Sequence, residues 1–186
     1  MSSKRKITVV TGGSRGLGKD MVFSLAKNGL DIVFTYNNQK EAADKVVKQI
    51  KDLGSQAIAM KLDVSDSSGF DVFVKNLKSE MQSHFDTDKF DFLINNAGFM
   101  IHGAYENVIE EEFVRMENAH FKPPFFLTQK LLPQINNFGG VVNVSSGITR
   151  FTTPGFSVYA AFKSAGKHWQ NFRLKNWEAE TSEPML

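Results

Sequence analysis

The sequence contains no cysteine among its 186 residues, so it can form no disulfide framework and supports no thiolate chemistry. Its formal net charge is only +2, too small to indicate a nucleic acid or an anionic membrane as partner. No apolar run approaches the ~18 residues of a transmembrane helix, and the basic start does not read as a signal peptide. The four histidines lack the spacing of metal ligands. We therefore expect a cytoplasmic protein without a metal site.

The chain does contain short β-branched runs that alternate with amphipathic segments. Strands are expected at 7–10, 31–36, 57–62, 90–95 and 141–144. Helical spacing follows the first strand and returns at 41–53, 70–81, 110–118 and 125–135, with Pro123-Pro124 as a break or kink. This alternation predicts an α/β fold: a single domain over 1–186, built as a doubly wound, Rossmann-like parallel sheet of five strands with helices on both faces.

The first strand runs into a glycine-rich turn, Thr11 to Gly18, and a helix follows. Glycine lets a backbone approach a pyrophosphate, and a helix N-terminus offers free N–H groups to an anion. The spacing of Gly12, Gly16 and Gly18 differs from Gly-x-Gly-x-x-Gly, and a glycine cluster alone could be a tight turn. The order of strand, turn and helix favours a dinucleotide site.

The end of the second strand bears on which dinucleotide is bound. An acid there would bind the ribose 2′-hydroxyl of NAD, but the chain reads Tyr36-Asn37-Asn38 and has no acid before Glu41. Arg15, inside the glycine turn, could instead pair with a 2′-phosphate, although it could also be a solvated loop charge. The pattern favours NADP(H) over NAD(H).

Two later strands also end in polar residues. Asp63-Val64 follows the third strand, where Asp63 could contact the adenine amine or cap the next helix. Asn95-Asn96-Ala97-Gly98 ends the fourth strand and could be either a turn at the cofactor or an ordinary Asn-rich turn. Because ligands bind at the carboxyl ends of parallel strands, both segments are candidates for the cofactor site.

A serine, a tyrosine and a lysine near the end of the chain suggest the chemistry. Tyr159 and Lys163 are four positions apart and share one face of a helix. Ser146 lies thirteen positions before Tyr159, at the end of the fifth strand. A phenol beside an ammonium group can give a proton to a carbonyl oxygen as hydride reaches its carbon. Tyr-x-x-x-Lys alone is common, so the pair indicates catalysis only together with the surrounding motifs.

Together these motifs, in this order over 7–165, resemble the classical short-chain dehydrogenase/reductase family. The resemblance implies that Tyr159 is the proton donor or acceptor, that Lys163 favours the ionised phenol and binds the nicotinamide ribose, and that Ser146 polarises the carbonyl. Asn118 matches the asparagine that supports a water and proton relay. The cofactor contacts implied are Gly12, Ser14, Arg15, Gly16, Leu17, Gly18, Asn37, Asp63, Val64, Asn95, Ala97, Gly98, Tyr159 and Lys163.

The family pattern stops after Ala165, and the tail at 166–186 is unlike it. Strands six and seven are expected to be missing, which leaves strand five as an exposed edge. A back-translation of the tail, read from its third base, encodes a segment similar to the next helix and sixth strand of the family. We therefore expect a one-nucleotide loss near codon 166, which the gene sequence can test. The apolar spacing of Phe162, Ala165, Trp169 and Phe172 predicts that the helix continues.

Three functions remain open on the sequence. The first is an NADP(H)-dependent oxidoreductase that reduces a ketone or oxidises a secondary alcohol, both small molecules. The second is a truncated, inactive remnant that at most binds the dinucleotide, and a purely structural interaction protein is a weaker third. The resemblance also implies that two copies could pair through the helices carrying Asn118 and Tyr159. The substrate is not identified.

Overall fold

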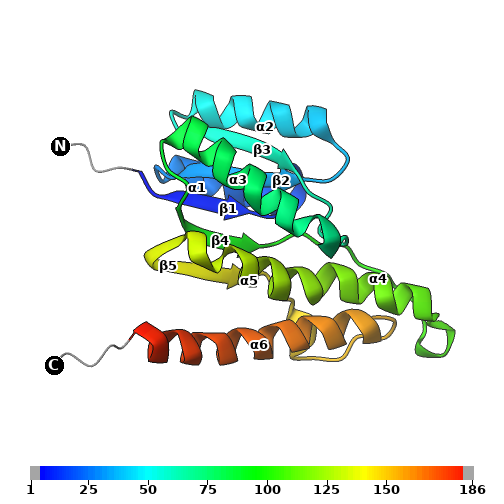
Figure 1. Cartoon of the computed structure of the whole chain (residues 1–186). Helices are drawn as coiled ribbons and strands as arrows, with labels where there is room; N and C mark the ends of the chain where they lie inside the picture. The colour runs from blue at the N-terminus through cyan, green and yellow to red at the C-terminus, as the bar shows by residue number, and fades with distance from the viewer. Residues whose placement is uncertain (1–4, 182–186) are drawn as a thin grey trace.

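The computed structural model describes the backbone of residues 5–181 and the side chains of residues 5–169. Its centre is one parallel sheet of five strands in the order β3-β2-β1-β4-β5 (Figure 1). The strands are β1 Ile7–Val10, β2 Asp31–Tyr36, β3 Ala57–Lys61, β4 Phe90–Asn95 and β5 Ile135–Asn143. The order reverses between β1 and β4, so the predicted doubly wound sheet is confirmed, and its ligand site is expected at that reversal.

Helices cover both faces of the sheet, as the alternating pattern predicted. They are α1 Gly16–Lys27, α2 Lys40–Asp52, α3 Phe70–Phe85, α4 Glu110–His120, α5 Thr128–Leu131 and α6 Ser157–Thr181. On one face α1 and α2 bury Val22 and Val46 against Phe34 of β2. On the other face α3 and α5 bury Phe73 and Leu131 with Leu93 of β4. These two apolar layers hold the strand ends, and hence the site, in fixed positions.

The structure corrects the region before the fifth strand. We expected a helix to continue to Ile135 and the strand to begin at 141, but β5 begins at Ile135. Pro133 ends the helical segment in a short 3-10 turn at Leu132–Gln134, since proline has no N–H to continue it. The pairing with β4 then contains a bulge that turns Phe138 outward in a left-handed conformation, with φ of 65°.

Two further expectations concern helices. Pro123-Pro124 does not end the helical path but opens a π-helical turn at Pro123–Leu127, which links α4 to α5. Helix α6 continues to Thr181, so the prediction that it extends past Lys163 is confirmed, although the side chain of Phe172 lies outside the described residues. It runs beside α4 (Figure 1), where the rings of Phe113 and Phe162 lie 4.9 Å apart. Within residues 5–181, no helix has the length and apolar character of a membrane span.

Candidate active site

The residues predicted to bind a cofactor gather at one edge of the sheet, where the parallel strands end. A cavity of about 560 Å³ opens there between the glycine turn and the ends of β2, β3 and β4. From the predicted cofactor set it is lined by Gly12, Ser14, Arg15, Gly16, Leu17, Gly18, Asn37, Asp63, Val64, Ala97 and Gly98. The other three predicted contacts are not part of this lining, but Asn95 and Lys163 line a smaller cavity next to it.

Hydrogen bonds join the glycine turn to the asparagine turn after β4. The Asn96 side-chain Nδ2 donates to the carbonyl oxygens of Thr11 and Gly12, at 2.9 and 3.0 Å. The Thr11 hydroxyl accepts from the backbone N–H groups of Asn96 and Ala97, at 2.9 and 3.0 Å. Gly12 has a φ of 72°, which favours glycine. The two turns therefore form one rigid wall of the cavity.

The N-terminus of α1 faces this cavity and can bind an anion. Arg15 is its N-cap residue, and the Arg15 side chain does not cap the first N–H groups. The free N–H groups and the helix dipole favour a negative charge at this end. The Arg15 side chain is exposed and lines the same cavity as Asn37, beyond β2. A phosphorylated ribose placed beside Arg15 would meet its guanidinium group.

Asp63 does not cap the following helix, and its contact with the adenine amine stays a prediction. Its Oδ1 accepts from the Ser65 backbone N–H and hydroxyl, at 2.9 and 2.6 Å. The capping role belongs to Asp66, whose Oδ1 accepts from the backbone N–H of Ser68. Hydrogen bonds from the Ser65 side chain lower the pKa of Asp63 below its ordinary value, against a smaller opposing effect of burial. Asp63 is therefore an ionised acceptor at the cavity wall.

Removing the Ser65 hydroxyl should raise the pKa of Asp63 back towards its ordinary value. A carboxyl whose pKa is lowered in the folded state contributes stability above its unfolded pKa of ~3.9, and that stability is lost as the pH falls through the folded pKa. The Ser65→Ala variant should thus lose this contribution at a higher pH than the parent, as a carboxyl NMR titration of Asp63 would measure. Ser68→Ala removes the same kind of bond at Asp66 and should leave Asp63 unchanged.

The predicted catalytic tyrosine and lysine lie together on α6, next to the end of β5. The Lys163 Nζ donates to the Val144 carbonyl oxygen at 2.8 Å and lies 5.7 Å from the centre of the Tyr159 ring. Burial lowers the pKa of Lys163 from its ordinary value. The bond to Val144 fixes the amine, and with it the helix face that carries Tyr159, against the sheet edge where the cofactor cavity opens.

The structure also gives the partners of the other predicted catalytic residues. Ser146 follows β5, and its Oγ accepts from the Ile148 backbone N–H at 3.4 Å, so its own hydroxyl hydrogen remains available to an acceptor. The Asn118 side-chain Oδ1 accepts from Lys122 Nζ at 2.9 Å. Asn95 is buried, and its Nδ2 donates to Thr128 on α5 and to Asn143 on β5. Asn95 therefore ties β4 to its neighbours.

Some residues of the site were not predicted as contacts. The lining of the cofactor cavity also includes Thr35, Tyr36, Leu62, Ser65, Asn96, Phe99 and Ala119. Most of them are sequence neighbours of predicted residues at the strand ends. The predicted strand ends could therefore have identified them. Asn95 and Asn96 are adjacent in the sequence, and successive side chains of an extended chain point in opposite directions. Asn95 therefore lies in the core, and Asn96 lies at the site.

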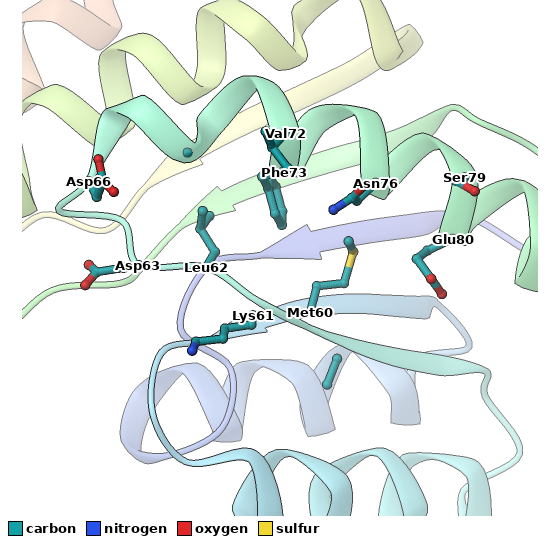
Figure 2. Close-up of a pocket in the computed structure, with 12 residues that line it drawn as sticks. Met60, Lys61, Leu62, Asp63, Asp66, Val72, Phe73, Asn76, Ser79 and Glu80 are labelled. Carbon is teal, nitrogen blue, oxygen red and sulfur yellow. The ribbon is translucent and has the colours of Figure 1, made fainter.

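A second hollow lies elsewhere, on the outer edge of the sheet between β3 and α3. It measures about 660 Å³, and Figure 2 shows Phe73 of α3 above Met60 and Leu62. It shares Leu62 and Asp63 with the cofactor cavity, but neither the glycine turn nor Tyr159 belongs to it. Size alone therefore does not identify the candidate site, because the predicted cofactor residues line the smaller cavity at the strand ends.

Known proteins match this arrangement in sequence and in structure. A family model described as short chain dehydrogenase matches residues 6–178. The short chain dehydrogenase mdpC of Emericella nidulans is 32% identical over 161 residues, which are 86% of this chain and 58% of that protein. A short chain dehydrogenase of Claviceps purpurea is 34% identical over 86% of this chain and 59% of its own length. This chain thus spans less than two thirds of these curated relatives.

Solved structures give the same result. The angucycline C-6 ketoreductase LanV with bound NADP superposes with a TM-score of 0.90 at 31% identity, covering 94% of this chain and 68% of that one. A blue fluorescent protein from a metagenomic library, in complex with NADPH, gives a TM-score of 0.85 at 29% identity and covers 94% and 69%. Both structures therefore support the fold, and both hold a nicotinamide dinucleotide.

Proposed function

Because this chain belongs to the short chain dehydrogenase family, we propose that it binds NADP(H) at the strand ends and reduces a ketone to a secondary alcohol. The observation that supports this most is the juxtaposition of two features. The glycine cradle opens at the same sheet edge to which Lys163 anchors the helix carrying Tyr159. A small-molecule carbonyl substrate, or the matching alcohol in reverse, would bind between them.

The residues of the chain have separate tasks in this reaction. NADPH, when bound, supplies the hydride for the carbonyl carbon. Tyr159 gives its phenolic proton to the carbonyl oxygen, and the Lys163 ammonium beside it stabilises the phenolate that remains. Ser146 donates its free hydroxyl hydrogen to the same oxygen and orients the carbonyl. Asn118 remains the candidate for the relay that restores the proton.

The glycine turn fits a pyrophosphate for a steric reason. A Cβ on Gly18 would lie 2.0 Å from the Gly12 carbonyl oxygen, and one on Gly12 would lie 3.0 Å from the Ala97 Cα. The backbone can therefore close tightly around the helix N-terminus only with glycine at these positions. This leaves the N–H groups of the turn accessible to a phosphate.

Arg15 supports the preference for NADP(H), and replacing it should reverse much of that preference. We expect Arg15→Ala to raise the Kd for NADPH about tenfold with little effect on NADH, because only NADPH carries the 2′-phosphate. Titration of cofactor fluorescence with both nucleotides measures this. Lys27→Ala, at the other end of α1, is the matched control and should change neither Kd. Equal loss of both nucleotides would place Arg15 outside the 2′-phosphate site.

Apolar side chains at the substrate end favour an apolar ketone. Phe99 and Met100 follow β4, Phe151 follows β5, and all three are exposed, Phe151 at 64%. Phe99 lines the cofactor cavity, and its ring lies 5.9 Å from that of His120, which in turn contacts Tyr159. A ring-bearing ketone would cover this surface. LanV acts on an angucycline, and proteins from Metarhizium species at 32% identity are hydroxynaphthalene reductase-like, which agrees with that class.

A second candidate is nucleotide binding without turnover. Phe99, Met100 and Phe151 are each exposed, whereas the dinucleotide cavity is well defined. Pairing of two copies through α4 and α6 also remains a prediction, and it is supported by the exposed side chains of Phe113 and Val114 on α4. A cytoplasmic location remains a prediction too.

One experiment separates the two candidate functions. Purified protein is titrated with NADPH and its fluorescence recorded, and consumption of NADPH is then followed with a panel of aliphatic and aromatic ketones. A rise and blue shift in fluorescence, together with turnover of the aromatic ketones, supports the reductase. Binding without turnover supports the second candidate. A folded protein that binds no nicotinamide nucleotide overturns both.

A further inference from the structure

A histidine that no motif predicts lies against the proposed proton donor. The His120 ring, on α4, meets the Tyr159 ring edge to face, with the centroids 5.1 Å apart and the planes at 87°. Its side chain is buried, at 4% exposure. A Cβ on Gly98 would lie 2.6 Å from the His120 Cε1, so the chain leaves room for this ring. His120 thus touches both the strand-four turn and the tyrosine.

The contacts of His120 fix its tautomer. Its Nε2 lies within hydrogen-bonding distance of the Phe99 carbonyl oxygen, which can only accept, so Nε2 carries the hydrogen. Burial, and then the charge of Lys163, lower the pKa of His120 to about 4. The ring is therefore neutral near pH 7, and its Nδ1 carries a lone pair. That Nδ1 is buried and has no hydrogen-bond partner among the described residues.

A complementary orphan atom lies on β5. Asn143 accepts from Asn95 through its Oδ1 at 2.7 Å, which leaves its Nδ2 as a donor. This Nδ2 is also buried without a partner in the described part of the chain. His120, Asn143 and Lys163 line one small cavity of about 40 Å³. A polar cavity of more than ~10–15 Å³ can hold a water molecule, and the residues that carry the unpaired donor and the unpaired acceptor both line this one.

We propose that His120 is a positioning residue for Tyr159 and Lys163, and that its Nδ1, together with Asn143 Nδ2, holds an internal water against the Lys163 ammonium. The water accepts from Asn143 and donates to His120. Lys163 has three hydrogens, of which one is bonded to Val144, so another can reach this water. The ring edge keeps the tyrosine in place. The inference extends the proposed function and depends on it only for its effect on turnover.

The water has a consequence for the charge of Lys163. Burial alone lowers the Lys163 pKa, and a hydrogen-bonded water stabilises the charged amine and opposes that decrease. The titratable groups that face Lys163 are Tyr159 and Lys167 from α6 and His120 from α4. From β5 and the residue after it come only the uncharged Asn143 and Val144. Removing the water should therefore lower the Lys163 pKa further.

The variant His120→Phe tests this, because phenylalanine keeps a ring against Tyr159 but has no Nδ1. We expect the Lys163 pKa, followed by carbon NMR of labelled lysine, to fall by about one pH unit. His84→Phe makes the same change on the exposed face of α3 and should have no effect. If the parent reduces ketones, the alkaline limb of kcat should move to lower pH by the same amount, which a purely structural role would not cause.

A crystal structure of the whole chain gives a second test. It should show a water within hydrogen-bonding distance of both His120 Nδ1 and Asn143 Nδ2. Asn143→Val removes the donor without a change at His120 and should lower the Lys163 pKa in the same direction. An unchanged Lys163 titration in either folded variant, or a cavity without water, overturns the inference. Because the NMR titration needs no turnover, an inactive parent would contradict only the proposed reaction.

Discussion

Replacing Tyr159 by Phe should lower kcat for ketone reduction by about a hundredfold to ten-thousandfold, the range that a positioned general acid contributes. Phenylalanine keeps the ring that packs on His120 and loses only the hydroxyl that gives the proton. The fold and the glycine cradle are untouched, so the Kd for NADPH should stay within about twofold. Steady-state rates and a fluorescence titration on the same protein preparation measure both quantities.

Tyr105→Phe is the matched control for this variant. Tyr105 is 81% exposed in a short 3-10 turn at Tyr105–Asn107, and the same loss of a hydroxyl there should not alter kcat. If Tyr159→Phe retained the rate of the parent, the proton would come from another group, and the proposed mechanism would be wrong. A loss of NADPH binding together with the rate would instead mean that the tyrosine holds the cofactor.

The parts of the fold that follow from local pattern were predictable from sequence. The runs at 31–36 and 90–95 form strands with the expected bounds, since β-branched and aromatic residues between polar ends specify a buried strand. The glycine turn was predictable for the same reason, because a strand, a glycine cluster and an amphipathic helix occur next to one another in the chain. The cavity at the strand ends follows from the parallel order.

The start of β5 was not predictable, because it depends on a distant strand. A helix was expected to reach Ile135, and 136–140 are rich in asparagine and glycine, yet Ile135 and Gly140 pair with Phe90 and Phe92 of β4 across a bulge. The bulge absorbs the extra residues, and Phe138 points to solvent. The start of β5 is set by pairing with a strand some forty-five residues earlier, so it cannot be recognised from the local sequence pattern.

The sequence predicted the candidate catalytic residues but not the residues around them. Ser146, Tyr159 and Lys163 stand at fixed spacings, whereas His120 reaches Tyr159 only because α4 packs against α6. Asn143 reads as one more strand residue until its amide is seen to bond with Asn95. Side chains that act through tertiary contacts have no spacing rule, so the structure alone brings them to the site.

Replacing Gly18 by Ala should abolish most NADPH binding and destabilise the fold, although helix propensity alone predicts the opposite. Alanine is better than glycine by about 1 kcal/mol inside a helix, and Gly18 lies within α1. However, its Cβ would lie 2.0 Å from the Gly12 carbonyl oxygen and 2.5 Å from the Asn96 Nδ2. Overpacking of this kind costs about 1–3 kcal/mol, so we expect a lower free energy of unfolding.

The displaced group is backbone, and this makes the effect on the cofactor large. Moving Gly12 away from Gly18 breaks the bond that Asn96 makes to the Gly12 carbonyl and opens the cradle at the helix N-terminus. A misplacement of about 1 Å at a site can reduce function on the order of a hundredfold, and we expect the Kd for NADPH to rise by that order. Denaturant unfolding and fluorescence titration check the two effects. Gly69→Ala, with a negative φ and open space around its Cβ, is the control and should change neither. If Gly18→Ala bound NADPH as the parent does, the tight closure of the turn would not be required for the cofactor, and the site would have to lie elsewhere on the strand ends.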